Sequence, residues 1–406
     1  MSHEPLNSVP MHARRPQSPA ETQREAQPES HPKVLVVTND YPPTLGGIQT
    51  YVRDYLATLD PKQVVVFAST QDREAAQKWD STTPYHVTRW PRSVMLPTPA
   101  TARRMQQLIR EHSIHTVWFA AAAPLALMAN AARRAGASRV VASTHGHEVG
   151  WSMFPGSRQV LRRIGESVDC LTYVSTYARN RLAGAFGPTV AWEAMPGGVD
   201  TDFFHPSPAA AQIRQRHGLA DKFVIVAVSR IVPRKGQDTL VAALPEIRTH
   251  IPNAHVLMVG PGAYGEKVQR LAQKLGVGDH VTFTGAVDYE ELPAYYSAGD
   301  VFALPVRTRF GGLSVEGLGI VYLEAQACGV ATIAGSGGGA PETVVDGTTG
   351  LVVSSKSELV DAVVSLHLDA ETRDSLARAG LERVREQWTW AVLGKRARRI
   401  LSGAVG

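Results

Sequence analysis

The sequence is poor in cysteine and has no long apolar run. Its 406 residues include only two cysteines, Cys170 and Cys328, each inside an apolar segment. This pattern excludes a disulfide-stabilised secreted scaffold and favours two buried thiols in a reducing compartment. No stretch reaches the roughly 18 consecutive apolar residues that a membrane-spanning helix needs. We therefore expect a protein that is cytoplasmic or bound peripherally to a membrane.

Residues 1–32 have almost no aliphatic side chains and no apolar segment of the kind found in a secretory signal, so we expect a disordered tail. The chain carries a net charge of +5, which suits a polyanionic partner such as nucleic acid, anionic lipid or a phosphorylated substrate. Trp118, Trp151 and Trp192 are too scattered for a base-stacking platform. We expect no nucleic-acid partner.

Short apolar runs alternate with segments of helical periodicity from residue 33 onward. The alternation predicts α/β architecture, with two tandem Rossmann-like, doubly wound parallel sheets. Pro, Gly and Asp interrupt it near 198–208, which we interpret as a hinge. We expect domains at 33–202 and 203–387, followed by a basic amphipathic helix within 388–406 that could pack back on either domain.

Two loops that follow a first strand are candidates for phosphate binding, because ligands of open parallel sheets lie beyond the carboxyl ends of strands. In the first half, Gly46 and Gly47 open a helix, where bare amides could meet a phosphate, although such a pair is more often a turn device. In the second half, the SRIVPRKG loop places Arg230 and Lys235 after a buried strand. Cations there stabilise a departing diphosphate, whereas a solvated basic loop is the alternative.

The segment EGLGIVYLEAQACG places one carboxylate in a loop and a second one on the helix that follows. Carboxylates accept hydrogen bonds from vicinal diols, so Glu316 and Glu324 could hold the hydroxyls of a sugar and a ribose. The amides of Gly319, Ile320 and Val321 at the start of the helix would face the phosphates.

The strand RVVAST ends in HGHE, which places His145 and His147 at the cleft. A histidine that bonds the reacting sugar, a metal-binding pair and a capped loop residue are the alternatives. The pair has no further His or Cys cluster, so we expect no metal ligands here. The sequence requires no cofactor, and Mg²⁺ could assist although no clear site exists.

Two further motifs have plainer interpretations. Gly260, Gly262 and Gly265 match a dinucleotide-binding pattern, but the acidic residue expected at the end of the next strand is missing. Asp200 and Asp202 form a D-x-D pair inside the expected hinge, where a turn is favoured over a metal-bound diphosphate.

Together, the GGIQTYV loop, the HGHE turn, SRIVPRKG and EGLGIVYLEAQACG resemble the GT-B glycosyltransferases of family four over residues 33–402. Longer runs such as NDYPPTLGGIQTYVRDYLAT are similar to the actinobacterial phosphatidylinositol mannoside mannosyltransferases, in particular to the second enzyme of that pathway. One departure is GGVD at the hinge in place of the more usual NGVD.

This resemblance implies a retaining transferase that moves mannose from GDP-mannose to phosphatidylinositol monomannoside, in α-1,6 linkage, in the synthesis of phosphatidylinositol mannosides, lipomannan and lipoarabinomannan. It implies that the cations neutralise the diphosphate and that His145 lies over the sugar. It places the donor against Gly47, Arg230, Lys235, Val287, Glu316, Gly319, Ile320, Val321 and Glu324.

The lipid acceptor implies peripheral binding to the inner face of the plasma membrane. Arg103 with Arg104, and Arg158 with Arg162 and Arg163, could rest on anionic lipid, although an ordinary solvated face is an equal alternative. Another family-four transferase, with a UDP- or GDP-sugar and a different lipid or soluble acceptor, remains open. So do an epimerase or phosphorylase on the same scaffold and a non-enzymatic binding module.

Overall fold

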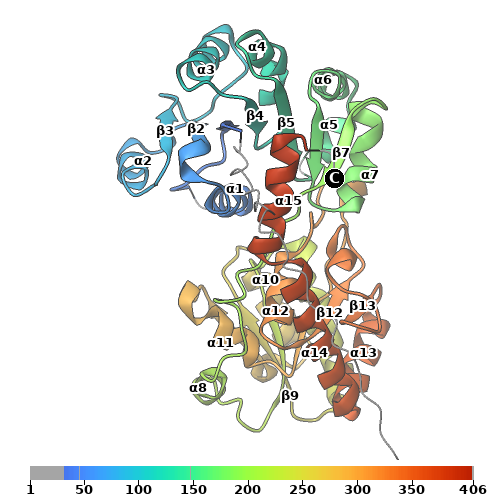
Figure 1. The fold of residues 1–406 in the computed structure, drawn as a ribbon. Coiled ribbons are helices and arrows are strands. Elements are labelled where there is room, and N and C mark those ends of the chain that lie inside the picture. The colour runs from blue at the N-terminus through green and yellow to red at the C-terminus, as the bar shows by residue number, and fades with distance from the viewer. Residues whose placement is uncertain (1–31, 45, 147, 405–406) are drawn as a thin grey trace, which may run out of the picture. The chain divides into compact units, whose positions relative to one another are not determined.

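The computed structural model describes residues 32–44, 46–146 and 148–404. Within them the chain forms two parallel sheets with helices packed against each (Figure 1). The tail expected over 1–32 lies outside the described residues except for Pro32, and so does His147.

The N-terminal sheet has seven strands in the order β3-β2-β1-β4-β5-β6-β7, all parallel. All five residues of β1 are buried, as expected for a parallel sheet that is covered on both faces. The strands are β1 (Val34–Thr38), β2 (Val64–Ala68), β3 (His86–Arg89), β4 (Thr116–Phe119), β5 (Arg139–Thr144), β6 (Cys170–Tyr173) and β7 (Ala191–Ala194).

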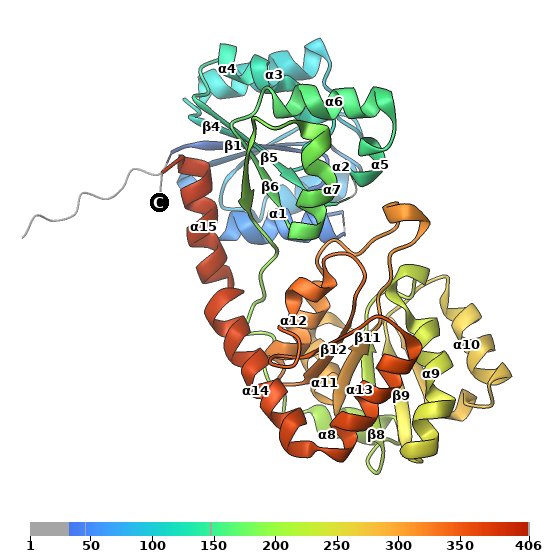
Figure 2. The same ribbon diagram turned by 90° about the vertical axis from the view of Figure 1, so that its right-hand side faces the viewer.

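Helices cover both faces of this sheet (Figure 2). Met105 of α3 and Ile164 of α6 are buried on one face, and Tyr55 of α1 is buried on the other. The helices of this half are α1 (Gly47–Ala57), α2 (Arg73–Asp80), α3 (Pro99–Glu111), α4 (Ala129–Arg134), α5 (Val149–Ser152), α6 (Pro155–Gly165) and α7 (Thr176–Phe186).

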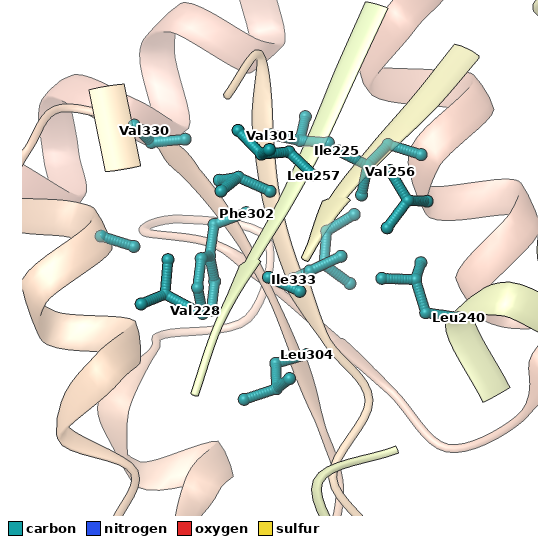
Figure 3. Packing of buried hydrophobic residues seen from close by; sticks show 14 of the residues in the cluster. Ile225, Val228, Leu240, Val256, Leu257, Val301, Phe302, Leu304, Val330 and Ile333 are labelled. Carbon is teal, nitrogen blue, oxygen red and sulfur yellow. The ribbon is translucent and has the colours of Figure 1, made fainter. Parts of the chain in front are cut away.

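The C-terminal sheet has six parallel strands in the order β10-β9-β8-β11-β12-β13. Its core contains Ile225, Val256 and Phe302 from three adjacent strands (Figure 3). The strands are β8 (Phe223–Val228), β9 (Ala254–Val259), β10 (Val281–Gly285), β11 (Val301–Leu304), β12 (Ala331–Gly335) and β13 (Leu351–Val353).

The last helix packs on the N-terminal sheet. Leu393, Ala397 and Ile400 of the last helix are buried in the same cluster as Tyr55, and the Thr116 hydroxyl donates to the Leu401 carbonyl at 2.9 Å. The remaining helices are α8 (Ala210–Arg216), α9 (Gln237–His250), α10 (Gly265–Lys274), α11 (Leu292–Ser297), α12 (Ile320–Ala327), α13 (Lys356–Leu368), α14 (Ala370–Gln387) and α15 (Trp390–Ser402).

Single turns of 3-10 helix complete the described chain. Two of them, η3 and η5, each contribute one residue to the candidate site, Arg234 and Tyr289. The turns are η1 (Pro61–Gln63), η2 (Leu125–Met128), η3 (Pro233–Lys235), η4 (Gly278–His280), η5 (Tyr289–Glu291), η6 (Phe310–Gly312) and η7 (Ala340–Thr343).

The prediction of two doubly wound sheets is confirmed, and both sheets have the strand order of Rossmann-like folds. Two strands, β3 and β7, fall outside the apolar runs of the sequence. Both are edge strands whose residues are partly exposed, so they lack the continuous apolar pattern of a buried strand. In each sheet the order reverses beside the first strand, where ligands of such folds bind.

Candidate functional site

A cavity of about 1160 Å³ is lined by both halves of the chain. The N-terminal half contributes the start of α1 and the loop after β5, and the C-terminal half contributes the loops after β8 and β11. Of the residues expected at the donor site, the cavity brings together Gly47, His145, Arg230, Glu316, Gly319, Ile320 and Glu324.

Three of the expected residues do not line this cavity. Lys235 is buried behind its wall and contacts it through Glu316. Val287 and Val321 are partly buried and pack against the C-terminal core. Their position follows from their apolar side chains, which leave only backbone groups for any polar ligand.

The strongest charge contact of the site joins the loops after β8 and β11. Lys235 Nζ lies 2.8 Å from Glu316 Oε2, and the two side chains are 10% and 13% exposed. Arg234 Nε lies 3.8 Å from the same oxygen. The carboxylate of Glu316 therefore lies between the two basic side chains of the loop after β8.

The loop that carries Arg230 is held by the side chain of the first residue of α9. Gln237 Nε2 donates to the Ser229 hydroxyl at 2.8 Å and to the Arg230 carbonyl at 3.1 Å. Gly236 has a φ of 76°, and a Cβ there would lie 1.9 Å from the Pro305 carbonyl oxygen. Only glycine fits this position, so the loops after β8 and β11 touch backbone to backbone.

Glu324 lies on α12 at the inner end of the cavity. Its Oε2 accepts a hydrogen bond of 2.5 Å from the Tyr296 hydroxyl. Burial raises the pKa of Glu324, while the bond from Tyr296 and the charge of Lys235 act in the opposite direction. Burial also raises the pKa of Tyr296, so the phenol remains a donor and leaves the other oxygen of Glu324 to bind a diol.

The start of α12 faces the same space. Gly319 precedes the helix in the left-handed region, with a φ of 92°. Within the described chain, no side chain caps the first amides and no acidic residue lies in the first turn. Uncapped amides at a helix start bind anions well, so this end of α12 can receive a phosphate.

His145 lies in the loop after β5, held by several contacts. Its Nε2 is 2.6 Å from the Ala120 carbonyl oxygen, which can only accept, so Nε2 carries a proton. The Tyr51 ring meets the imidazole edge to face, with centroids 4.8 Å apart. The buried Glu148 accepts from the amides of His145 and Gly146 at 3.1 and 3.0 Å. These contacts hold the imidazole in one orientation.

The wall opposite the cations is formed by α1. A Cβ on Gly47 would meet no described atom within 4 Å, so packing does not require glycine there. The Tyr51 and Tyr55 hydroxyls donate to the carbonyls of Met195 and Pro196 at 2.8 and 2.5 Å. These bonds tie α1 to the segment that leads into the C-terminal half.

Direct hydrogen bonds also join the two halves outside α15. The carboxylate of Glu342 accepts from the amides of Thr176 and Tyr177 at 2.7 and 2.8 Å. Arg181 Nη2 donates to the Gly311 carbonyl at 2.8 Å. Both contacts are made by α7, so the donor-side loops are tied to the helix that follows β6.

The glycine motif at residues 260–265 and the Asp200 and Asp202 pair have structural roles. A Cβ on Gly260 or Gly262 would lie 2.3 or 2.2 Å from carbonyl oxygens of the loop after β8, so these glycines permit close backbone packing. Asp200 Oδ1 accepts from the amides of Asp202 and Phe203, which is a turn. Among the described residues, no three His, Cys, Asp or Glu side chains are grouped as for a metal ion.

Several residues of the site were not singled out from the sequence. Arg234 lines the cavity together with Arg230. Its position next to Lys235 in the sequence could have indicated it. Tyr289 also lines the cavity and stacks on Phe203, with centroids 4.6 Å apart. No local pattern could have indicated this pair, because the two residues come together only through the tertiary structure.

Two sequence relatives are similar to this chain over nearly their whole length. A protein of Corynebacterium glutamicum, "GDP-mannose-dependent monoacylated alpha-(1-6)-phosphatidylinositol monomannoside mannosyltransferase", is 52% identical over 91% of this chain and 97% of its own. A "GDP-mannose-dependent alpha-(1-6)-phosphatidylinositol monomannoside mannosyltransferase" of Mycolicibacterium smegmatis is 51% identical over 91% and 98%.

Solved structures show the same fold at low identity. HepE of Anabaena in complex with UDP has a TM-score of 0.76 at 19% identity and covers 91% of this chain and 99% of its own. Sucrose-phosphate synthase of Thermosynechococcus elongatus has a TM-score of 0.73 at 23% identity, over 90% and 97%. Family models also match, "Glycosyltransferase Family 4" at residues 45–203 and "Glycosyl transferases group 1" at residues 210–383. The chain therefore belongs to the GT-B glycosyltransferases of family four and, within them, to the group of these mannosyltransferases.

Proposed function

We propose that this protein transfers mannose from GDP-mannose to phosphatidylinositol monomannoside, in α-1,6 linkage and with retention of configuration. The observation that carries the proposal is the single cavity in which Arg230 and Glu316 of one half meet His145 of the other. Relatives that are about half identical over nearly their whole length carry this activity in their names.

The diphosphate of the donor would lie between Arg230 and the uncapped amides of α12, with the Lys235 ammonium behind Glu316 in the wall of the cavity. Lys235 neutralises Glu316 at 2.8 Å, so the carboxylate can lie near the phosphates without strong repulsion. Glu316 would accept hydrogen bonds from mannose hydroxyls. Glu324 would bind the ribose diol while Tyr296 holds its second oxygen.

The reacting bond would lie between the two halves. Gly47 leaves room for the donor on the side of α1, and the imidazole of His145 would pack against the sugar. As the bond between the anomeric carbon and the phosphate oxygen breaks, an acceptor hydroxyl attacks the same face. Its proton moves to the departing phosphate, so no enzymatic nucleophile is required. Fixed cations and amides stabilise the growing negative charge of the diphosphate.

A transfer assay tests this proposal. Purified protein is incubated with radiolabelled GDP-mannose and either phosphatidylinositol or phosphatidylinositol monomannoside, and the linkage of the product is determined. We expect a labelled dimannoside only from the monomannoside. Labelling of phosphatidylinositol alone, or transfer only from a UDP-sugar, would contradict the proposal. Calorimetry with GDP and UDP gives an independent readout of the nucleotide preference.

We also propose that the protein works at the inner face of the plasma membrane as a peripheral protein. No described helix is both long and apolar enough to span a bilayer. Helix α6 carries Arg158, Arg162 and Arg163 at exposed positions. Arg162 forms an ion pair with Glu166 at 3.4 Å, and both side chains of this pair are exposed. Exposed basic side chains of this kind bind anionic lipid.

Liposome sedimentation tests the role of these arginines. Changing Arg158, Arg162 and Arg163 together to Glu should weaken binding to anionic vesicles and leave binding to neutral vesicles unchanged. Changing the three exposed basic residues of α10, namely Lys267, Arg270 and Lys274, to Glu is the matched control. Equal losses in the two triple variants would indicate an effect of net charge rather than of α6.

A further inference from the structure

Four large apolar side chains are exposed in two loops, and one of them, Leu313, lines the cavity. Met153 and Phe154 lie between α5 and α6 and are 47% and 64% exposed, and Phe310 and Leu313 lie in the loop after β11 and are 68% and 53% exposed. We call these four residues the apolar rim. Contiguous exposed apolar residues of this size commonly mark a binding surface.

Leu313 connects the rim with the cavity and with the loop of the other half that carries Met153 and Phe154. A Cβ on Gly150 would lie 3.6 Å from Leu313 Cδ2, and the Met153 amide donates to the Gly150 carbonyl at 3.3 Å. Arg181 holds the same loop through the Gly311 carbonyl. Leu313 itself lines the cavity. The rim therefore meets the cavity at Leu313.

The backbone holds Phe310 outward at an energetic cost. Its φ is 51°, in the left-handed region that bulky residues rarely adopt, and Gly311 and Gly312 follow with φ values of 63° and 106°. An aromatic residue that is both strained and exposed gains little from folding. Such strain is typical of functional positions, so the position of Phe310 points to a ligand.

Positive charge accompanies the rim. The Arg309 guanidinium lies 4.7 Å from the centroid of the Phe310 ring, and Arg158 is exposed on the helix that Phe154 precedes. Aromatic and basic side chains together suit the boundary between lipid head groups and hydrocarbon. A purely apolar protein partner would not need these cations.

We propose that the apolar rim enters the membrane surface and receives the acyl chains of the lipid acceptor while its polar head group reaches into the cavity. The inference rests on the proposed function, because only an amphiphilic acceptor needs both surfaces. The cavity would accommodate the sugar end, and Leu313, which belongs to both the cavity wall and the rim, would lie where the chains begin. The rim therefore distinguishes acylated from deacylated acceptors.

The test compares two forms of one acceptor. Phosphatidylinositol monomannoside is presented in phosphatidylcholine vesicles, and its water-soluble deacylated form is prepared from the same lipid. For the F154S/F310S double variant, we expect a roughly tenfold lower kcat/KM with the vesicles, because apolar contact area is lost. The value with the deacylated acceptor should stay within about twofold of wild type. Leu368→Ser is the matched control, since Leu368 is 77% exposed at the end of α13.

Each outcome separates the rim from the proposed function. An equal loss of kcat/KM with both acceptors, or no loss with the vesicles, would contradict the proposed role of the apolar rim. A smaller oligomer of the double variant in ultracentrifugation would assign the surface to a second copy of the chain and also overturn the proposal. If the wild type transferred mannose to neither acceptor, the result would contradict the proposed function. The proposed role of the rim would then be contradicted as well, because it depends on that function.

Discussion

The two sheets share the same strand order, but the loops and helices after their first strands, β1 and β8, carry different kinds of side chain. After β1 the chain presents Gly47 and then buries Tyr51 and Tyr55, whose hydroxyls bond to backbone carbonyls. After β8 the chain presents Arg234 and the buried Lys235, paired with Glu316. The N-terminal half thus contributes fixed geometry and a mutually paired Arg53 and Asp54, and the C-terminal half contributes the cluster of cations.

This difference shows that the topology determines where a site forms and that the loops determine what it does. Both sheets reverse their strand order beside the first strand, which creates a ligand position at the same place. The residues in each loop are then independent of the sheet, because they face the cavity rather than the core. A division of roles between the halves follows, and each prediction below tests part of it.

The largest effect is expected when the charge of the C-terminal half is reduced. Lys235→Ala should lower kcat/KM by about 100- to 1000-fold and weaken GDP binding, because the buried cation behind the proposed diphosphate position is lost and Glu316 is left without its partner. The measurements are steady-state kinetics and calorimetry. Lys356→Ala is the control, since Lys356 pairs with Glu246 at 2.7 Å but both are 48% exposed. Unchanged GDP binding by Lys235→Ala would refute the assigned charge site.

A smaller effect of a different kind is expected in the N-terminal half. His145→Ala should lower kcat about 10- to 100-fold, because the proposed contact of the imidazole with the reacting sugar would be lost. Binding of GDP itself should change little, since His145 would contact the sugar and not the nucleotide. Calorimetry and single-turnover rates separate the two effects. His86→Ala, on the exposed edge strand β3, should behave as wild type, and weaker GDP binding by His145→Ala would break the division between halves.

The contact between the halves should have a modest effect. Glu342→Ala leaves the amides of Thr176 and Tyr177 at the start of α7 without their acceptor, which costs roughly 1 kcal/mol. Because the bond joins the halves, kcat/KM should fall by about fivefold. Glu358→Ala is the control, since Glu358 caps the Ser354 amide within one half and should change stability alone. Equal kinetic constants of the two variants would show that activity does not depend on this contact between the halves.

The smallest expected effect is a pH dependence from the C-terminal half. Burial raises the pKa of Glu324 above its value in the unfolded chain, so the folded state binds its proton more tightly. Its stabilising contribution is therefore fully present below about pH 4.3, the usual pKa of Glu, and is lost as the pH rises through the folded pKa. The free energy of unfolding of wild type relative to Glu324→Gln should fall as the pH rises above about 4.3. A constant difference in urea titrations would indicate an unshifted carboxyl.

Much of this fold could be predicted from local patterns. The buried strands appear as apolar runs, because a parallel sheet that is covered on both faces exposes none of its side chains to solvent. The edge strands β3 and β7 could not be predicted, since their exposed residues break that run. The side on which α15 packs was also undecidable, because its amphipathic pattern fits any apolar surface and only the sheet beside Thr116 decides it.

The sequence by itself determined the two sheets and the residue types that gather at their edges, because strand ends and helix starts are local properties. Only the tertiary structure decided the partners: that Lys235 bonds to Glu316, that Ala120 orients His145, and that Glu342 caps α7. These pairs join loops far apart in the chain, and their energies depend on distance and burial. Neither quantity can be read from spacing along the sequence.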